Sequence, residues 1–491
     1  MTASDDEVCW WPARQVAEAI AARRLSAREY LAAQLDRVER LNPLLNAVVT
    51  IDERAAAQAA DADAAVMRGQ PLGPFHGVAM TVKDCMATAG LRTTGGLPGL
   101  ASHVPREDAS AIAALRDAGV VVFGKTNVPA GSGDLQTYNE LFGVTRNPWD
   151  LGRSPSGSSG GAAAAVAAGL SPLEIGSDVA GSIRLPAAMC GVFGHKPSHG
   201  LVPTHGHVPP APYKPGNVDM NVVGPIARTV DDLGAALDVI AGPHPWDRRA
   251  WQVSLPPARP LRRVATWFDD SYCPVDAAVR RALEDAAQRL SADGVAVEDA
   301  RPPGIRLEAS DLVFRRLLAG VAVHSYSAQD VAAMAHGEHP PGEELGGRFA
   351  GQSYRDWAEA DDRRTRMRAR WHQFFTECDA ILLPVAPNTS IPHDHRPFAE
   401  RRIVVDGTER PYWDQIVWAG LTGVSYLPST VVPVGLDPGG TPIGLAVAGP
   451  YLEDLTTLAV ARRLAGLLPP AAPAPLTRTK DAAASAAALT N

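Results

Sequence analysis

Three separate segments carry side chains that together could perform acyl transfer without a histidine. They are "TVKDCM", which contains Lys83, the glycine- and serine-rich run "SPSGSSGG" with Ser158, and "GSDVAGS", which ends in Ser182. A serine hydroxyl becomes a good nucleophile only when a base removes its proton, and a lysine can act as that base only when it is neutral. The three segments therefore predict a serine nucleophile assisted by a lysine.

Lys83 stands at the end of the short apolar run 77–82, where a buried strand is expected. The ordinary pKa of lysine is about 10.4, so roughly one lysine in a few thousand is neutral at pH 7. Burial disfavours the ammonium form and can lower the pKa by about 3 to 5 units. A buried Lys83 is thus predicted to serve as the base.

Ser158 and the segment before Ser182 would supply the other requirements. Glycines on both sides of Ser158 permit an unusual backbone geometry that aims its hydroxyl inward, where it could relay a proton between Lys83 and the nucleophile. The backbone N–H groups before Ser182 would lie at the start of a helical segment, which suits an oxyanion hole for a tetrahedral intermediate. The predicted donors are Val179, Ala180 and Gly181.

The run 154–161 has two other interpretations. It could be a flexible linker, but the helix-like "AAAAVAAG" that follows it favours a packed loop. It also matches G-x-S-x-G at Ser159, the nucleophile elbow of α/β-hydrolases, which needs an acid and then a histidine later in the chain. Asp379 and His393 are available, but no spacing supports them and no strand pattern precedes Ser159. This esterase hypothesis ranks below the lysine-dependent site.

Two further motifs suggest ligands and are better explained as structure. "GVVVFGKT" at 119–126 matches the Walker A pattern, yet the apolar residues between its glycines indicate a strand and not a phosphate-binding loop. Pro197 interrupts the helical spacing that a zinc protease requires in the histidine cluster of His195, His199, His205 and His207. We interpret these as loop histidines that could contact substrate, and we expect no metal.

The rest of the chain alternates helical and strand patterns, which predicts an α/β fold with buried strands. Ser26 and Glu29 form a capping box for a helix that should stop at Pro43. Further helices are predicted at 108–119, 162–169 and 275–290, and strands at 77–82, 119–124, 295–300, 380–385, 429–435 and 443–449. The last three strands are expected to return to the same sheet as the first ones.

Two proline-rich segments are not expected to form regular structure. Residues 203–216 are predicted to be a loop that shapes the site, because the segment is long for a loop in a compact domain. The Ala/Pro-rich residues 469–491 are predicted to be a mobile tail that follows a catalytic domain at 1–468.

Composition excludes several classes of protein. The chain has 491 residues, 46% of them hydrophobic and 20% charged, and its net charge of -8 gives no basic field for nucleic acid. The five cysteines include no C-x-x-C pair, and their odd number favours a reducing, cytoplasmic compartment. No apolar run approaches the roughly 20 residues of a membrane-spanning helix, and the acidic start "MTASDDEV" is unlike a signal peptide.

Taken together, the motifs resemble those of the amidase signature enzymes, the family of fatty acid amide hydrolase, malonamidase, aryl acylamidases, urethanases, nylon-oligomer hydrolases and amidotransferase A subunits. G-S-[IV]-R-x-P and C-G-x-x-G-x-K-P follow the glycine and serine block. The similarity extends through "FGKTNVPAGS", "GVTRNPW" and "TPIGLAVAGP". The resemblance implies a single large α/β domain, in which a mixed central β-sheet is covered by α-helices on both faces.

The resemblance also implies roles for the three segments. Ser182 would be the nucleophile, Ser158 the bridging serine and Lys83 the base of a Ser-cisSer-Lys triad. The cis peptide bond of the family would fall between Gly157 and Ser158. The glycine and serine run is then a catalytic loop and not a linker.

Residues around the triad also match the family, with two departures. Ser159, Asp178 and Arg184 match positions that brace the catalytic loop by hydrogen bonds. Ser156 stands where the usual block has a glycine, and Ala180 stands where the family more often has the first of two glycines before the nucleophile. The second departure concerns the geometry of the oxyanion hole.

The implied reaction is hydrolysis of a small-molecule amide or carbamate, without a cofactor, through an acyl-enzyme. An aryl or alkyl pocket is suggested by Tyr138, Tyr213, Trp413, Trp418 and Tyr426, although core packing explains each of them equally well. The candidate substrate-contacting residues are Gly131, Tyr138 and Trp413.

Two alternatives of other classes are retained. The chain could be the A subunit of a tRNA-dependent amidotransferase, which works within a complex. It could also be an inactive scaffold, which the presence of Lys83, Ser158 and Ser182 disfavours. Homodimers are common in the family and are compatible with this sequence; neither a nucleic-acid nor a membrane partner is expected.

Overall fold

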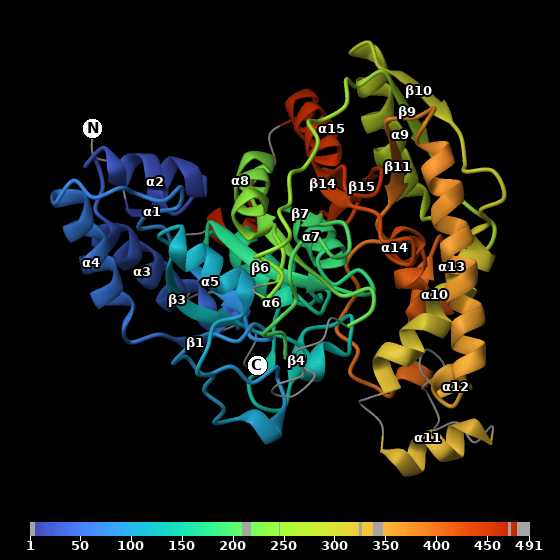
Figure 1. The fold of residues 1–491 in the computed structure, drawn as a ribbon, viewed down its shortest axis with the longest axis horizontal. Helices are drawn as coiled ribbons and strands as arrows, with labels where there is room; N and C mark the ends of the chain where they lie inside the picture. Colours follow the sequence, from blue (N-terminus) through green and yellow to red (C-terminus); the bar gives the residue numbers. More distant parts are fainter. Residues whose placement is uncertain are drawn as a thin grey trace.

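A mixed β-sheet of eight strands forms the centre of the molecule (Figure 1). The computed structural model describes residues 5–208, 218–244, 246–323, 327–336, 347–469 and 473–478. The strand order is β10 (Ala296–Asp299), β9 (Arg263–Thr266), β11 (Ala380–Pro384), β15 (Pro442–Ala448), β14 (Ser429–Leu436), β7 (Phe193–Lys196), β8 (Val222–Ala227) and β6 (Leu173–Asp178). β9 pairs in parallel with β10 and β11, and all the other pairs are antiparallel.

The first two predicted strands belong to a different sheet. β2 (Ala79–Lys83) and β3 (Val121–Thr126) pair with β1 (Val48–Ile51) in a three-stranded sheet of order β1-β3-β2. The expectation of one shared sheet was therefore wrong for these strands. β2 instead meets β6 through side chains, since the Thr81 hydroxyl donates to the Glu174 carboxyl over 2.6 Å. Apolar periodicity shows that a strand is buried, but not which strand lies beside it.

Helices cover both faces of the eight-stranded sheet. α6 (Gly160–Ala167) and α7 (Arg184–Cys190) pack together on one face, and α8 (Val230–Ile240), α9 (Ala277–Ala292) and α15 (Asp454–Leu467) cover the other. Alternation along β7 separates the two layers: a Cβ at Gly194 would meet Ala187 of α7, whereas His195 contacts Asp454 of α15. The predicted fold class, a mixed sheet between helical layers, is thus confirmed.

Smaller elements surround this core. The N-terminal helices are α1 (Asp5–Val8), α2 (Ala13–Ala21), α3 (Ala27–Leu45), α4 (Ala55–Met67) and α5 (Ser110–Asp117). On the opposite side of Figure 1 lie α10 (Leu307–Ala322), α11 (Ala328–Ala335), α12 (Gly347–Ala350), α13 (Tyr354–Phe374) and α14 (Val417–Gly423). Two short hairpins complete the fold, β4 (Tyr138–Asn139) with β5 (Gly143–Val144), and β12 (Arg402–Val405) with β13 (Thr408–Pro411).

Local patterns predicted a part of these elements, namely the helices α3, α5, α6 and α9 and the strands β2, β3, β10, β11, β14 and β15, with one error at a helix end. The Ser26–Glu29 capping box is present at the start of α3. The helix does not stop at Pro43 but continues to Leu45 and ends at Asn46, whose φ of 52° is left-handed. A proline in the last turn removes one N–H donor, and packing of the helix can compensate for that loss.

Close backbone approaches fix the start of α6, the helix that follows the glycine- and serine-rich loop 154–159. A Cβ at Gly161 would lie 2.5 Å from the backbone N and O of Asn127. Any side chain there would push α6 away from the segment that follows β3. Glycine is therefore required at this position by space and not by backbone conformation.

We expect Gly161→Ala to destabilise the fold by about 1 to 3 kcal/mol, the usual cost of overpacking, and to lower activity by displacing the loop. Gly466→Ala is the matched control, because Gly466 also lies in a helix but has open space around its Cβ position. That control should leave stability unchanged or raise it by up to about 1 kcal/mol. Urea unfolding of both variants measures the difference, and equal stabilities would contradict this account.

Candidate active site

The three predicted segments meet in the structure. Lys83 ends β2, Ser158 precedes α6, and Ser182 lies in the turn after β6. The Lys83 Nζ donates a hydrogen bond to the Ser158 Oγ over 2.8 Å. The Ser159 N–H donates to the carbonyl of Ser182 over 3.2 Å, which joins the loop to the turn. Lys83 and Ser158 are fully buried or nearly so, and Ser182 retains 8% exposure.

The glycine and serine run is a packed loop. The peptide bond between Gly157 and Ser158 is cis, as the resemblance implied. A Cβ at Gly157 would lie 2.6 Å from the carbonyl oxygen of Asp134, so only glycine fits against that backbone. Every residue from Ser154 to Gly161 is buried. The linker interpretation is therefore wrong.

Asp178 and Arg184 hold the turn that contains Ser182. The Asp178 carboxylate accepts from the Arg184 Nε and Nη2, both over 2.9 Å, and from the N–H groups of Gly181 and Ile183 over 2.8 and 3.1 Å. Burial alone would raise the pKa of Asp178, but the Arg184 guanidinium and these bonds lower it to about 2. The carboxylate thus stabilises the turn above about pH 4, and this contribution is lost as the pH falls through about 2.

The Asp178 carboxylate also binds one of the three predicted oxyanion-hole donors. The N–H of Gly181 points at the Asp178 carboxylate, so this predicted donor is already engaged. Gly181 has a φ of +110° and its Cβ position is 2.8 Å from Leu185, which explains why glycine stands there. Val179 and Ala180 are half-buried and lie directly before Ser182. Their N–H groups are the remaining candidates among the three that were predicted.

The surroundings of Lys83 favour its neutral form. Burial lowers the pKa of Lys83 from its ordinary value, and the negative charges of Cys85, Asp178 and Glu174 oppose this only in part. Burial likewise raises the pKa of Glu174 to about 7. The Lys83 Nζ donates to two hydroxyls, those of Ser158 and Ser177, and hydroxyls stabilise an ammonium less than carboxylates do.

The sequence analysis did not identify Ser177 and Cys85 as neighbours of Lys83 and His207. The Ser177 Oγ lies 2.9 Å from the Lys83 Nζ and 2.9 Å from the Nε2 of His207. The thiol of Cys85 lies 3.4 Å from the same Nε2, and although burial raises its pKa, His207 and Lys83 lower it to about 6. Ser177 directly precedes the recognisable Asp178, but no pattern links it to a histidine thirty positions later.

The other histidines have different surroundings. His195 was predicted to lie in a loop, but it lies in β7, where its ring is buried between Thr430 and Asp454. His199 stacks on Tyr426 with ring centroids 4.2 Å apart. His205 lies edge-on to His244 at 5.1 Å. Among the described residues, no group of three or more His, Cys, Asp or Glu is arranged to hold a metal ion.

The Walker-like segment and the hydrolase elbow have structural roles. Residues 121–126 form β3, and the Lys125 Nζ donates to the Thr88 hydroxyl over 2.8 Å, which holds the segment after Lys83. Asp379 accepts the N–H groups of Arg262 and Arg263 at the start of β9. The carboxyl of Asp379 is therefore committed to the far end of the sheet and not to Ser159.

Two of the candidate substrate residues, Tyr138 and Trp413, belong to one aromatic cluster next to the loop that carries Ser158. Tyr412 donates its hydroxyl to Asp134 over 2.6 Å and lies 5.2 Å from the ring of Trp413. Arg401 bridges the Asp134 carboxylate and the Tyr138 hydroxyl, each over 2.7 Å. Asp134 in turn packs against Gly157, so the cluster adjoins the loop that carries Ser158.

The other described candidate substrate residues lie outside this aromatic cluster. Gly131 is half-buried, with a φ of 61°, in a short turn, and its N–H donates to the carbonyl of Gly95. Trp418 is buried in the core and donates to the carbonyl of Cys273 over 3.1 Å, so it does not line a substrate pocket. Tyr426 donates its hydroxyl to Asp219. Tyr213, with part of the predicted loop 203–216, lies outside the described residues.

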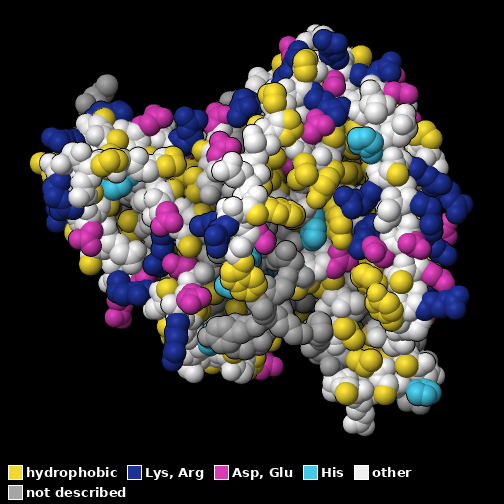
Figure 2. All heavy atoms as spheres, viewed as in Figure 1, with side chains coloured by type: hydrophobic (Ala, Val, Ile, Leu, Met, Phe, Trp, Pro, Cys, Tyr) yellow, Lys and Arg dark blue, Asp and Glu magenta, His cyan; other side chains and the backbone are white. Residues whose placement is uncertain are grey.

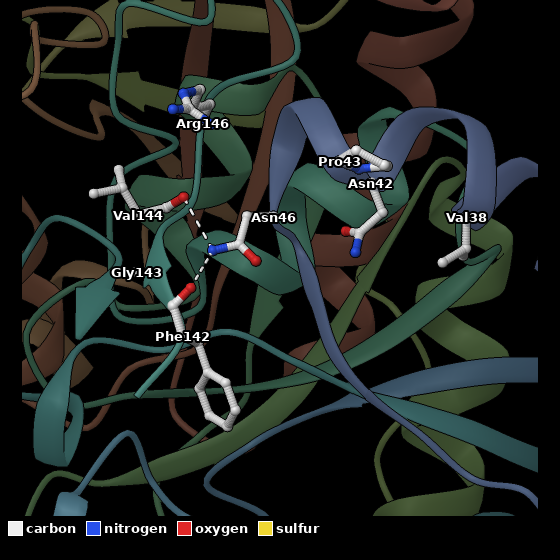
Figure 3. Close-up of a pocket in the computed structure, with 8 residues that line it drawn as sticks. All are labelled: Val38, Asn42, Pro43, Asn46, Phe142, Gly143, Val144 and Arg146. Atoms are coloured by element: carbon white, nitrogen blue, oxygen red, sulfur yellow. Dashed lines mark hydrogen bonds between the residues drawn. The ribbon is translucent and has the colours of Figure 1, made fainter. Parts of the chain in front are cut away.

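A surface hollow near α3 is separate from this site. Its lining includes Asn46, whose Nδ2 donates to the carbonyls of Phe142 and Val144 over 2.6 and 3.2 Å (Figure 3). None of Lys83, Ser158 and Ser182 lines it. The hollow is therefore not part of the candidate site formed by these three residues.

The surface carries charged side chains of both signs (Figure 2). On the face shown in Figure 2, basic and acidic side chains are interspersed among the described residues, without a continuous basic field. Within the described ranges, no helix combines the length and apolar character that crossing a membrane requires.

Comparison with known proteins defines the class of this fold and site. The family model described as Amidase matches residues 29–458. The A subunit of glutamyl-tRNA(Gln) amidotransferase from Carboxydothermus hydrogenoformans is 32% identical over 93% of this chain and 96% of its own. An acylamidase of Rhodococcus erythropolis is 32% identical over 95% of this chain and 97% of its own. The crystal structure of a bacterial aryl acylamidase superposes with a TM-score of 0.81, at 27% identity, over 94% of this chain and 97% of that one.

These matches and the arrangement of the three segments agree. The chain belongs to the amidase family, the amidase signature enzymes.

We expect Arg184→Met to destabilise the protein by about 3 to 5 kcal/mol, since it leaves the Asp178 carboxylate buried without its counter-charge. The matched control is Arg14→Met, because Arg14 pairs with Glu18 at 3.9 Å where both side chains are more than half exposed. That change should shift stability by less than about 0.5 kcal/mol. Urea unfolding at pH 7 compares the two, and a small effect of Arg184→Met would show that the ion pair does not hold the turn.

Proposed function

We propose that this chain is a stand-alone amidase that hydrolyses the carbon–nitrogen bond of a small aryl or alkyl amide through an acyl-enzyme on Ser182. The observation that carries the proposal is the buried hydrogen bond between the Lys83 Nζ and the Ser158 Oγ, beside the turn that holds Ser182. The bond supports this proposal because burial lowers the pKa of Lys83, Ser158 lies within hydrogen-bond distance of its Nζ, and Ser182 retains 8% exposure.

In the proposed mechanism, neutral Lys83 takes the proton of Ser158 while Ser158 takes that of Ser182. The Ser182 oxygen attacks the substrate carbonyl, whose oxygen becomes an anion held by backbone N–H groups before Ser182. The proton on Lys83 then returns through Ser158 to the leaving nitrogen, and the amine departs. Water, deprotonated by the same route, attacks the acyl carbon. The ester bond to Ser182 then breaks, the carboxylic acid leaves, and the proton returns from Lys83 through Ser158 to the Ser182 oxygen. Each step uses only groups of this chain, and no cofactor is required.

The proposed substrate class draws on the aromatic cluster that adjoins the loop carrying Ser158. Phe398, Tyr412 and Trp413 lie within ring contact of one another, and we propose that this cluster borders an aryl or alkyl group of the substrate. The names of the acylamidase and aryl acylamidase relatives agree with this choice. Carbamates and esters have the same carbonyl geometry, so urethanase and esterase activity belong to the same proposal.

The alternative is the A subunit of a tRNA-dependent amidotransferase, which the identity to the Carboxydothermus protein favours. Activity of the isolated chain on a simple amide distinguishes the two. None of the five cysteines, all of which lie within the described residues, forms a disulfide, which fits a reducing environment. We therefore propose a cytoplasmic location. A homodimer is compatible with this function.

We expect the purified chain to release nitroaniline from 4-nitroacetanilide at pH 8 without a partner protein, and Ser182→Ala to lower kcat by about 10⁴-fold or more. Ser110→Ala is the control, because Ser110 is also 8% exposed but lies at the start of α5. Equal rates for wild type and Ser182→Ala would reject Ser182 as the nucleophile. Activity that appears only after partner subunits are added would favour the amidotransferase.

The rate is expected to rise with pH, because only neutral Lys83 can accept a proton. Since burial lowers its pKa, the midpoint of kcat/KM should lie below 10.5, with activity lost on the acid side. Cys85, Asp178, Glu174 and, through Ser177, His207 face this lysine. Cys85→Ala should keep the acid limb, which would show that the thiol does not cause it. A rate that is constant from about pH 5 to 9, with chemistry rate-limiting, would contradict the role of Lys83.

A further inference from the structure

Neutral Lys83 must direct its lone pair at one particular neighbour. As a base it has two N–H bonds and one lone pair, and the lone pair has to face the Ser158 hydroxyl hydrogen. Ser177 is the second hydroxyl within reach, 2.9 Å from the Nζ. A hydroxyl can donate as well as accept. If Ser177 donated its hydrogen to the lone pair, Lys83 could not receive the proton of Ser158.

His207 occupies the position that prevents this. Its Nε2 lies 2.9 Å from the Ser177 Oγ, on a segment anchored beside Lys83: the N–H of Val208 donates to the carbonyl of Cys85 over 2.7 Å, and Met86 forms a β-bridge with His207. An imidazole with its proton on Nδ1 accepts at Nε2. The Ser177 hydrogen then points to His207, and the oxygen of Ser177 presents its lone pair to an N–H of Lys83.

We propose that His207 is a positioning residue, which acts through Ser177 to set the direction of the hydrogen bonds around Lys83. The chain of donors then runs from Lys83 to Ser177 to His207, and the lone pair of Lys83 is left for Ser158. Cys85 belongs to the same group of polar side chains, with its sulfur 3.4 Å from the Nε2 of His207 and 3.7 Å from the Ser177 Oγ. The inference rests on the proposed role of Lys83 as the base.

The test compares two replacements of His207 in the full-length enzyme, with 4-nitroacetanilide as substrate. His207→Leu removes the acceptor, and we expect kcat to fall about tenfold to a hundredfold with KM unchanged. This is less than the roughly 10² to 10⁴ that the proton transfer itself contributes, because His207 acts only through Ser177. His207→Gln keeps an acceptor oxygen near the Nε2 position and should stay within about threefold of wild type. His205→Leu is the control, because His205 lies on the same segment as His207 but its ring contacts His244. Thermal melting of each variant checks that it folds.

A second measurement separates this role from a structural one. If His207 acts only through the Ser177 hydroxyl, His207→Leu should change kcat by less than about twofold in a Ser177→Ala background. Effects that multiply in the double variant would overturn the inference, as would a His207→Gln variant that folds but is as slow as His207→Leu.

Two further variants distinguish failure of the positioning role of His207 from failure of the proposed function. Lys83→Met and Ser182→Ala are measured in the same series. If both are inactive while His207→Leu matches wild type, the positioning role is wrong and the triad stands. If either retains the wild-type rate, the proposed mechanism fails, and with it the role of His207.

Discussion

The structure depends on one costly feature, a lysine buried without a directly bonded carboxylate. Taking an ammonium out of water is unfavourable, so Lys83 is held in a setting that favours its neutral form. Its hydrogen-bond partners Ser158 and Ser177 are hydroxyls, and the negative charges of Cys85, Asp178 and Glu174 offset the cost of burial only in part. The free energy that this arrangement costs must come from the packing around it, which explains why β2, the loop before α6 and the end of β6 are all buried.

Two kinds of rigidity hold the rest of the site. Space fixes the loop, because Gly157 and Gly161 approach other backbone segments too closely for any side chain. Charge fixes the turn, because the Asp178 carboxylate binds both the Arg184 guanidinium and backbone N–H groups on either side of Ser182. The two are joined by the Ser159 N–H and the Ser182 carbonyl. Close packing therefore positions Ser158, and the Asp178 carboxylate positions Ser182. The hydrogen bond from the Ser159 N–H to the Ser182 carbonyl connects the two segments.

Sequence reasoning reached the residues that have local signatures and missed those that depend on tertiary contacts. Lys83, Ser158 and Ser182 could be found because glycine runs, strand ends and family motifs mark them. Six strands (β2, β3, β10, β11, β14 and β15) were found by their apolar runs, whereas β6, β7, β8 and β9 of the main sheet were not predicted. The separation of β2 and β3 from the main sheet was also missed, since pairing is decided by distant partners. Ser177 and His207 carry no mark in the sequence that links them. Their relation exists only after residues 204–208 fold back beside β2.

The division into two sheets has a further consequence. The proposed base ends a strand of the three-stranded sheet, whereas the proposed nucleophile follows a strand of the eight-stranded one. Catalytic competence is thus a property of how the two sheets dock. A relative displacement of about 1 Å would leave each sheet intact but separate the reacting groups, and such displacements can cost about a hundredfold in rate. On warming, inactivation should accordingly precede the loss of secondary structure, so enzymatic activity reports on sheet docking earlier than circular dichroism does.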